Sequence, residues 1–432
     1  MNYCIKIVCQ RHSVEYIGFS SLTRLVLLNM NAPVQLLNTK ITSSDLAAVD
    51  RPIDEARGMP NPAYTDQQCF EFERDYILAK NWTAVGFVDQ LDNDMVRPLD
   101  FMGLPILLTR SKDGELKVFH NVCSHRGMKL VDEERKTRGL IVCPYHSWTY
   151  SVQGELKATP HIGGVGVHTV QGFNCENRGL KEIRSHIWLG IVFINLNGNA
   201  PAFDEDAKVA MERAKSLMGE AGETALRAPA SNGSLMMQVE CNWKLAVENY
   251  LEAYHLPFIH PDLNSYSPLS EHSCEIHGEK TAGQLTTTFD PKLDSENPLP
   301  MFPQWDPERI RNGDYPVVYP NLLLGFQANH IFAMIIHPLT PTRSREELAI
   351  FYVGKGASDS VFDEARRANL KDWSAVFSED IGPCERMQIG RQSPGYSGGS
   401  FSPKLDVCSH HFHKWIARQY IDNASGVFDS EL

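Results

Sequence analysis

The segment CSHRG at residues 123–127 is followed closely by CPYHSW at residues 143–148. Each segment holds one cysteine and one histidine, either two or three positions apart. Thiolate and imidazole are side chains that bind transition metals. The two segments therefore predict one metal site made by two similar loops, with Cys123, His125, Cys143 and His146 as its ligands.

Two kinds of site use two thiolates and two imidazoles. One is a structural zinc ion, and the other is a [2Fe–2S] cluster of the Rieske type, in which two histidines replace two cysteines on one iron. Zinc fingers place cysteine beside cysteine and histidine beside histidine, whereas each loop here offers one of each. The spacing therefore favours the cluster, with Cys123 and Cys143 on one iron and His125 and His146 on the other. We expect the histidine edge to be exposed.

The totals narrow the class of protein. A chain of 432 residues is long enough for two or three domains. A net charge of −12 argues against a surface for nucleic acid or for an anionic membrane. No apolar run approaches the roughly 20 residues of a transmembrane helix. The ten cysteines form no disulfide framework, so we expect a reducing, cytoplasmic compartment.

The chain divides into three parts. Residues 1–64 are expected to form a disordered extension or an extended arm, and residues 30–64 of it are polar and contain four prolines. Residues 65–197 begin with a helical pattern that Thr65 can cap and then turn to strands, as an all-β unit with the metal motif at two hairpin tips. Within it, HIWLGIVFINL (186–196) is expected to form one buried strand. Residues 198–432 mix helices with strands, so the fold class is α+β.

A second group of chemically active residues lies in NWKLAVENYLEAYHLPFIHPDL (242–263). His255 and His260 are five residues apart, and Pro257 prevents a smooth helix between them, so His260 can converge with His255 from the following turn. Glu252 precedes His255 by three residues and shares its helical face. Two histidines and one carboxylate on one side of a metal form the non-heme Fe(II) triad, which leaves positions open for O₂.

The third ligand need not be local. The helical stretch FSEDIGPCERMQIG (377–390) offers Glu379 and Asp380. From the residues alone, either carboxylate can complete the triad.

Residues 66–432 resemble the catalytic α subunit of the Rieske non-heme iron oxygenases. The resemblance rests on C-x-H-x17-C-x-x-H, on NWK…ENYLEAYH…H and on the later ED…CE..Q.G. It implies a Rieske [2Fe–2S] β-domain followed by a helix-grip catalytic domain with an antiparallel sheet. It also implies one cluster and one Fe(II) in each subunit, with Asp380 rather than Glu379 as the third ligand.

The resemblance implies how the two metals cooperate. Family members form a ring of three subunits, so that the cluster of one chain abuts the iron of the next. The acidic residue before the first histidine bridges the two centres, which makes Glu252 a catalytic residue that meets His146 across the subunit interface. HIGGVGVH (161–168) does not give the G-x-G-x-x-G motif of a dinucleotide site. Electrons must therefore come from a separate NAD(P)H-dependent reductase or ferredoxin.

The substrate is expected to be a small organic molecule. A glutamate bridge in the short segment ENYLEAYH resembles the branch that acts on choline, carnitine and betaines, by hydroxylation beside nitrogen or by N-demethylation. A quaternary ammonium group favours an aromatic cage, for which Tyr319, Phe326 and Phe332 are the candidates. Hydroxylation of an aromatic ring or aromatic acid is the alternative, since the same rings could stack on it. A Rieske electron-transfer protein without catalysis is the alternative of another class.

Overall fold

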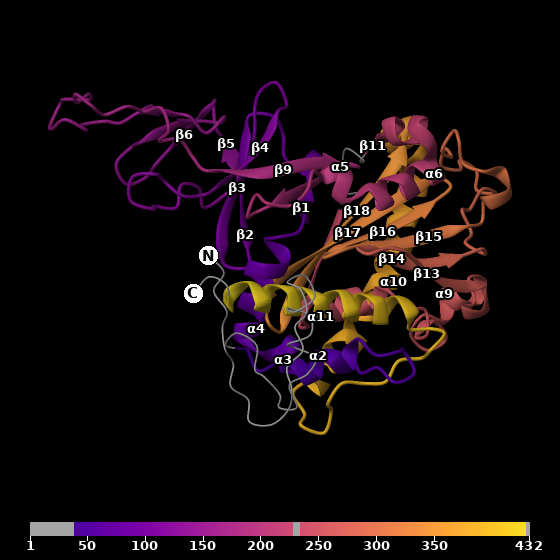
Figure 1. Ribbon diagram of the computed structural model, residues 1–432. Helices are drawn as coiled ribbons and strands as arrows, with labels where there is room; N and C mark the ends of the chain where they lie inside the picture. The colour runs from indigo at the N-terminus through magenta and orange to yellow at the C-terminus, as the bar shows by residue number, and fades with distance from the viewer. Residues whose placement is uncertain (1–38, 228–233, 429–432) are drawn as a thin grey trace, which may run out of the picture.

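The computed structural model describes residues 39–227 and 234–428. Figure 1 shows an elongated β domain on the left and a larger α+β domain on the right. The first 38 residues lie outside the described residues, so the structure does not bear on the expectation for most of the N-terminal extension. Among the described helices, none combines the length and the apolar character that crossing a membrane requires.

The β domain contains ten strands in two antiparallel sheets. Seven strands run in the order β1-β10-β9-β4-β3-β2-β5, and β6-β7-β8 form a small separate sheet. The loop with Cys143 and His146 joins the paired strands β6 and β7, so the predicted hairpin tip is confirmed there. The loop with Cys123 and His125 joins β4 to β5, which do not pair, and is closed only by the isolated bridge Val122–Lys129. The strands are β1 (Thr83–Phe87), β2 (Met95–Phe101), β3 (Leu104–Arg110), β4 (Leu116–His120), β5 (Arg135–Lys136), β6 (Leu140–Val142), β7 (Thr149–Ser151), β8 (Leu156–Ala158), β9 (Glu182–Trp188) and β10 (Ile191–Asn195).

The apolar run 186–196 is not one strand, and that prediction was wrong. The run folds back on itself, with Trp188 of β9 paired directly with Ile191 of β10. The two turn residues, Leu189 and Gly190, have φ values of 51° and 75°. Positive φ at both positions belongs to the tight hairpin turn that matches the twist of its strands. A leucine in the first of these positions hid the turn from the sequence.

The α+β domain is built on one strongly twisted antiparallel sheet. Its order is β11-β18-β17-β16-β15-β14-β13, and β12 also pairs with β18. The predicted antiparallel sheet is therefore confirmed. The strands are β11 (Leu226–Arg227), β12 (Ser234–Val239), β13 (His272–Gly278), β14 (Thr281–Thr286), β15 (Gly313–Val318), β16 (Leu322–Gln327), β17 (His330–Thr340) and β18 (Arg343–Val353).

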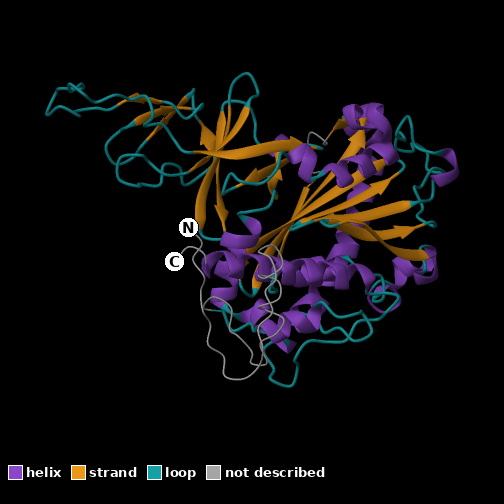
Figure 2. Ribbon diagram, viewed as in Figure 1, coloured by secondary structure: helices purple, strands orange, loops and turns teal. Residues whose placement is uncertain are grey.

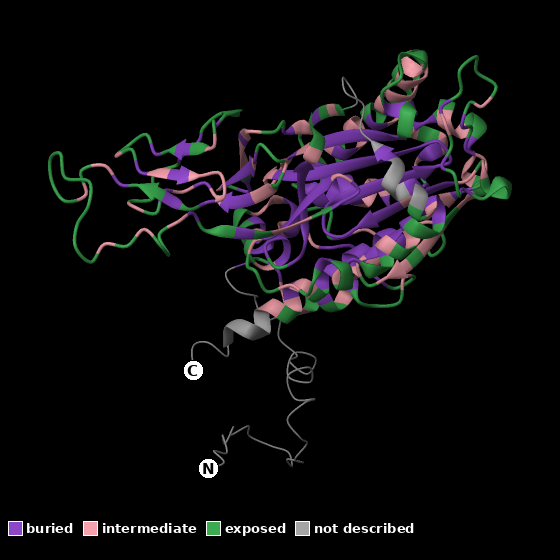
Figure 3. Ribbon diagram, turned by 90° about the horizontal axis from the view of Figure 1, so that it is seen from above, coloured by how far each residue is buried: buried purple, intermediate pink, exposed green. Residues whose placement is uncertain are grey.

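Helices cover both faces of this sheet (Figures 1 and 2). The face that packs on α7, α10 and α11 is called the inner face, and the face under α5 and α6 the outer face. Figure 3 shows that buried residues concentrate in this sheet, whereas much of the tip of the β domain is exposed. The helices are α5 (Phe203–Asp206), α6 (Lys208–Ala225), α7 (Trp243–Tyr250), α8 (Leu256–Ile259), α9 (Pro261–Tyr266), α10 (Asp363–Gly390) and α11 (Val407–Phe428).

The described part of the expected extended arm is folded and packed. Residues 39–64 contain α2 (Ser43–Val49) and most of α3 (Pro62–Thr65). Val49 is fully buried, and its carbonyl accepts a hydrogen bond from His410 of α11 (3.0 Å). These residues are therefore not an extended arm. The many prolines and polar residues of the segment suggested one, but its apolar side chains anchor it on α11.

The helix expected from residue 65 begins slightly later than predicted. Asp66, not Thr65, caps α4 (Gln67–Phe72), because its carboxylate accepts from two backbone N–H groups of the first turn. A π-helical turn continues from Glu73 to Leu78. Its Glu73 carboxylate is fully buried and contacts the Lys244 ammonium at 2.7 Å, which fixes this helix to the start of α7.

One asparagine joins the two domains. The side chain of Asn321, after β15, accepts from the backbone N–H of Ala84 in β1 (3.0 Å) and donates to the Ala84 carbonyl (2.9 Å). It also donates to the carbonyl of Ile336 in β17 (3.0 Å). Because the group is buried and all its bonds are made, it fixes how the β domain meets the catalytic sheet.

Candidate active site

The two loops of the Cys–His motif have the same backbone design. The N–H of Cys123 donates to the carbonyl five residues later, and the N–H of Cys143 does the same, both at 2.8 Å. Four residues after each cysteine the chain turns with positive φ, 72° at Gly127 and 55° at Ser147. Each loop therefore presents its cysteine and histidine from one tight turn.

The four side chains fit a two-iron cluster better than a single zinc ion. Cys123 and Cys143 are each only 2% exposed, while His125 and His146 are partly exposed with ring centroids 4.7 Å apart. Tetrahedral zinc would bring all four ligand atoms within about 4 Å of one another. Among the described residues, no three of these four meet even a 4.8 Å limit. The buried Nδ1 of His125 makes no hydrogen bond, as expected for an atom that binds metal.

Tyr150 of β7 is a functional candidate that the sequence did not single out. Its hydroxyl lies 3.1 Å from the Cys123 sulfur and accepts from the N–H of Ser124 at 3.0 Å. Burial raises the pKa of Tyr150 to about 12, so the hydroxyl stays protonated and can donate to the sulfur. Hydrogen bonds to cluster sulfurs tune the reduction potential. No motif marks such a residue, because its role depends on the pairing of β7 with β6.

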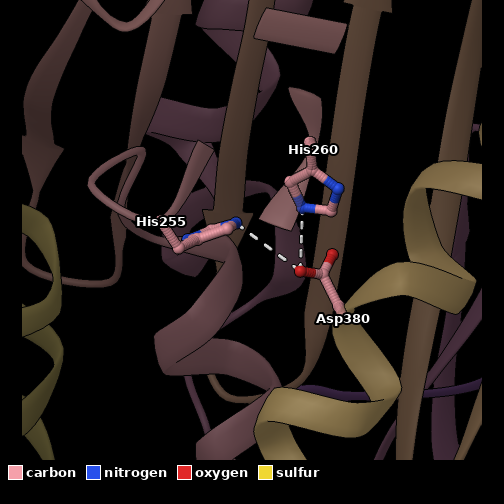
Figure 4. Close-up of side chains that lie close together, drawn as sticks. All are labelled: His255, His260 and Asp380. Carbon is pink, nitrogen blue, oxygen red and sulfur yellow. Dashed lines mark hydrogen bonds and ion pairs between the residues drawn. The ribbon is translucent and has the colours of Figure 1, made fainter. Parts of the chain in front are cut away.

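The second site brings together three side chains from distant parts of the chain (Figure 4). One carboxylate oxygen of Asp380, on α10, lies 2.9 Å from Nε2 of His260 and 3.5 Å from Nε2 of His255. With metal bonds of roughly 2.1 Å, neighbouring ligand atoms lie about 3 Å apart. The spacing therefore fits one ion bound to both imidazoles and the carboxylate. Nothing else in the described residues forms such a group.

Each histidine of this site is held by a second carboxylate. Nδ1 of His255 lies 2.5 Å from Glu252, and Nδ1 of His260 lies 2.7 Å from Glu379. An imidazole that donates through Nδ1 presents a free Nε2, which is the nitrogen that faces Asp380 here. Glu379 therefore contacts the outer side of His260 and Asp380 its inner side. This geometry favours Asp380 as the ligand, as the family resemblance implied.

The local fold explains how His255 and His260 converge. Asn242 caps α7, and the helix ends at Tyr250, before Glu252 and His255, which therefore do not lie on one helical face as predicted. A turn carries Glu252, whose carboxylate accepts from the N–H groups of Tyr254 and His255. Pro257 stands in the first turn of the short helix α8, where its missing N–H has no cost. His260 ends α8, which places its ring beside that of His255.

One more acidic group influences the site. Glu346 of β18 is 8% exposed, and burial raises its pKa to about 8, with the negative charge of Asp380 adding to the effect. The register pairs it with Ile336, so it lies on the inner face. The first five residues of β18 are polar, RSREE, and nothing in this charged run indicates that Glu346 rather than Glu347 faces Asp380.

Six aromatic side chains pack against one another between α10 and the inner face, and we call them the aromatic wall. Phe332 lies at its centre, with its ring centroid 4.4 Å from Trp373 and 5.3 Å from Phe377. Gly325 makes room for this ring, since a Cβ there would lie 2.1 Å from it. Phe377 precedes Asp380 by one helical turn, so the wall begins at the triad. Its members are Tyr250, Phe289, Tyr315, Phe332, Trp373 and Phe377.

A group of carboxylates lies beside the wall around Tyr266 of α9, and we call it the acidic rim. Burial raises the pKa of the Tyr266 hydroxyl to about 12, and nearby negative charges add to the rise. Lys292 contacts one of them, Asp372. The carboxylates of the rim are those of Asp262, Asp290, Asp372 and Glu379.

The three residues predicted to bind substrate are not brought together. Phe332 lies in the aromatic wall. Phe326 points to the outer face and packs in the core under α5 and α6. Tyr319 packs against α11, with its hydroxyl 3.0 Å from Nδ1 of His411. Phe326 and Phe332 lie on the neighbouring strands β16 and β17, where one-residue alternation decides which face a side chain reaches, whereas Tyr319 lies just after β15.

Comparisons with known proteins agree with both sites. Residues 81–171 match the family described as the Rieske [2Fe-2S] domain, and residues 219–422 match the ring hydroxylating alpha subunit (catalytic domain). The oxygenase subunit of carnitine monooxygenase from Escherichia coli (strain K12) is 31% identical over 386 residues, covering 85% of this chain and 95% of that protein. Choline monooxygenase, chloroplastic, from Arabidopsis thaliana is 28% identical, with 84% and 82% covered.

A solved structure extends the likeness to the fold. A quaternary ammonium Rieske monooxygenase, studied for carnitine oxidation by gut microbiota, superposes with a TM-score of 0.71 at 23% identity, covering 90% of this chain and 100% of that one. The two matched domains are those that bind a [2Fe–2S] cluster and a mononuclear iron. The chain therefore belongs to the Rieske non-heme iron oxygenases, as an oxidoreductase of the catalytic α subunit type.

Proposed function

We propose that the protein is the terminal oxygenase that hydroxylates a quaternary ammonium compound at a carbon attached to nitrogen. O₂, two electrons and two protons are consumed, and one oxygen atom enters the substrate while the other leaves as water. Where the carbon is an N-methyl group, the product loses an aldehyde and leaves a demethylated amine. The electrons come from a separate reductase or ferredoxin.

Seven side chains are proposed as metal ligands. Cys123 and Cys143 hold one iron of the cluster, and His125 and His146 hold the other. The mononuclear iron is held by His255, His260 and Asp380. Glu379 is not among the ligands, because it contacts the far side of His260. Together the bound metals supply one-electron transfer and an open site for O₂.

The acidic rim beside the aromatic wall is the observation that carries the substrate class. Aromatic faces attract cations, and carboxylates near the same space strengthen that attraction. A neutral aromatic ring would gain stacking from Phe332 and Trp373 but nothing from Asp262, Asp290 or Glu379. The charge therefore favours an ammonium group over an aromatic ring. The names of the relatives point the same way.

The protein's own residues position the reaction. Glu252 and Glu379 accept from Nδ1 of the two histidines, which keeps each Nε2 aimed at the metal site. The aromatic wall holds the cationic end of the substrate and keeps water from the reacting carbon. Trp373 and Phe377 lie about two turns and one turn before Asp380 on α10, so these two wall residues and the ligand belong to one helix.

We further propose a homotrimer in which the cluster of one subunit faces Glu252 of the next. Figure 1 shows β6 on the side of the β domain away from the α+β domain, well separated from α10 of the same chain. Tyr145 beside His146 is 59% exposed, and Phe258 beside the Glu252 turn is 75% exposed. Exposed aromatic side chains at both places suit an interface between two copies. His146 of one copy would then meet Glu252 of another.

A single-turnover experiment tests the reaction. The iron-loaded protein is reduced chemically, the reductant is removed, and ¹⁸O₂ is added with choline, carnitine, glycine betaine or an aromatic acid. We expect one labelled oxygen in an ammonium product, or a demethylated amine with its aldehyde, by mass spectrometry. A labelled aromatic ring with no reaction of any ammonium compound would reject the proposal.

A further inference from the structure

The loop between β8 and β9 carries apolar side chains that the described residues leave uncovered. Val165 is 98% exposed, and Val167 and Val170 are 48% and 46% exposed. We call residues 161–172 of this loop the valine loop. Apolar side chains gathered on one exposed segment mark a contact with another molecule.

The valine loop is ordered by its own backbone. The N–H of Gly163 donates to the Val167 carbonyl, and the N–H of Val167 donates to the Gly164 carbonyl, both at 3.0 Å. The second bond closes a tight turn with Val165 at its apex. A loop that is already ordered loses less conformational entropy when it binds a partner. The loop is therefore suited to present Val165 to another surface.

The base of the valine loop lies beside the cluster site. Phe173 packs edge-on against Trp148, with ring centroids 5.8 Å apart, and Trp148 stacks on His125 at 4.7 Å. The ring of His146 lies 4.7 Å from that of His125. The valine loop therefore leaves the β domain close to the histidine edge of the cluster site. Wherever that edge docks, the loop docks nearby.

A cavity of about 370 Å³ lies on the α+β domain, between the segment after α2, the end of β13 and α11. We call it the α11 pocket. Its apolar lining comes from Ile53, Ile276, Val407 and Trp415. Trp415 is 2% exposed, whereas Ile276 is 49% exposed. The cavity is roughly twelve times the volume of one liquid water molecule, so it has room for apolar side chains.

The α11 pocket begins beside the turn that carries Glu252. Its residue Val407 follows Asp406 directly. Burial raises the pKa of Asp406, and the nearby negative charge of Glu252 adds to the rise. Trp415 lies eight residues after Val407, or about 12 Å along α11. The pocket therefore extends over about 12 Å of this helix from the neighbourhood of Glu252.

The positions of the two surfaces match across a subunit interface. Figure 1 shows β6, of the small sheet that ends in β8, on the side of the β domain away from the α+β domain. If His146 of one subunit meets Glu252 of the next, the valine loop of the first subunit starts beside that contact. The α11 pocket of the second subunit starts there too, so the two surfaces come within reach of each other.

The composition of the valine loop favours a protein surface of low charge as its partner. Residues 158–175 contain no Asp, Glu, Lys or Arg, although 22% of the chain is charged. An anionic lipid surface attracts segments rich in Lys and Arg. Association with a charged partner is steered by complementary charges. The loop offers neither feature.

The charges at the α11 pocket nearly balance. Lys414 and Arg418 line it, and both contact the carboxylate of Asp50, at 3.0 and 3.8 Å. Arg51 and Glu279, which also line it, carry opposite charges. A charged segment would bury a charge of its own in such a pocket, which is costly. An uncharged apolar loop avoids that cost.

We propose that the valine loop of one subunit docks in the α11 pocket of the next, with Val165 against Ile276 and Trp415. The inference rests on the proposed homotrimer and adds a contact that lies apart from both metal centres. This contact would hold the β domain of one subunit in place while its cluster faces Glu252 of the other.

Subunit exchange between tagged and untagged trimers of the iron-loaded protein tests the contact, and native mass spectrometry follows it. Val165→Asp should speed exchange about tenfold or more, because it places a carboxylate against apolar side chains at the interface. Ile276→Arg alone should speed exchange as well. The two substitutions together should slow exchange again, since opposite charges then meet at every interface.

Val361→Asp is the matched control. Val361 is 48% exposed and lies in the short helix before α10. This variant should exchange subunits at the rate of the unsubstituted protein. Val165→Asp should keep the Tm of the isolated subunit and the paramagnetic resonance signal of the reduced cluster, because Val165 is almost fully exposed in its own chain.

The outcomes separate the inference from the proposed trimer. Unchanged exchange in Val165→Asp, an equal effect of Val361→Asp, or no recovery in the double variant would overturn the contact while the trimer stands. Slower electron uptake from the reductase in Val165→Asp, with exchange unchanged, would assign the loop to the electron donor and overturn it too. If the unsubstituted protein forms no trimer, the proposed assembly fails and the inference fails with it.

Discussion

The two metal centres of this protein are built in opposite ways. The cluster loops lie within residues 123–146, and each loop repeats the same turn around a cysteine. The mononuclear site joins His255 and His260 to Asp380, which comes from a helix more than a hundred residues later. Short-range geometry therefore determines the first centre, while the packing of α7, α8 and α10 determines the second.

The difference predicts that the centres can be lost separately. Cys143→Ala should abolish the cluster and leave the mononuclear iron, because α10 and the His255 turn do not depend on the β6–β7 hairpin. Asp380→Ala should do the reverse. Each change should lower turnover by about a thousandfold or more, as when one member of a catalytic unit is removed.

Iron analysis and electron paramagnetic resonance of the reduced cluster measure the two centres independently. If Cys143→Ala also emptied the mononuclear site, the centres would not be independent and the comparison would fail.

The orienting carboxylates sharpen the comparison inside the second centre. Glu379→Gln should weaken iron binding about 10- to 100-fold, since losing the acceptor on a ligand histidine has effects of that size. Glu252→Gln should do the same through His255 and should also slow electron arrival, because Glu252 is proposed to face the cluster of another subunit. Iron titration and rapid mixing with reduced protein separate these effects. Equal slowing of electron arrival in both variants would contradict the special place of Glu252.

A matched pair of phenylalanines tests which face of the sheet binds substrate. Phe332→Leu should raise KM for an ammonium substrate by about 3- to 30-fold, which corresponds to the loss of one cation–π contact. Phe326→Leu, on the outer face, should lower Tm without changing KM. If Phe326→Leu changed KM and Phe332→Leu did not, Phe326 would be the residue that binds substrate, as the sequence predicted.

The smallest expected effect concerns the first centre. Tyr150→Phe removes one hydroxyl that lies 3.1 Å from the Cys123 sulfur. Losing a hydrogen bond worth about 1 kcal/mol should lower the reduction potential by about 40 mV. Protein-film voltammetry measures the shift. Tyr76→Phe is the control, because it removes a tyrosine hydroxyl that lies far from the cluster. The reduction potential of this variant should equal that of the unmodified protein.

The same difference between the two centres explains which parts of the structure could be predicted from the sequence. Cys123, His125, Cys143 and His146 lie close together in the chain, so their spacing was enough to indicate a cluster held by two loops. The mononuclear site was harder to predict, because its third ligand is far from the two histidines in the chain and only tertiary packing brings them together. The residues alone could not choose between Glu379 and Asp380, and the structure separates them by the sides of His260 that they contact.

Errors of one residue explain most of the other differences. Phe326 and Phe332 both belong to apolar strands, and only the register shows that they face opposite ways. The Leu189–Gly190 turn was hidden because a leucine occupies a position that usually takes a small or polar residue. Tyr150 and Glu346 act through neighbours on adjacent strands, which a single sequence does not reveal.

The central claim is that the two centres of one chain work only between copies. Two inactive variants, Cys143→Ala and Asp380→Ala, are given different tags, co-expressed and purified as mixed trimers through both tags. If the cluster of one subunit serves the iron of the next, the mixed trimers regain activity, with about one working pair among the three interfaces of the ring. Mixed trimers no more active than either variant alone would contradict the account.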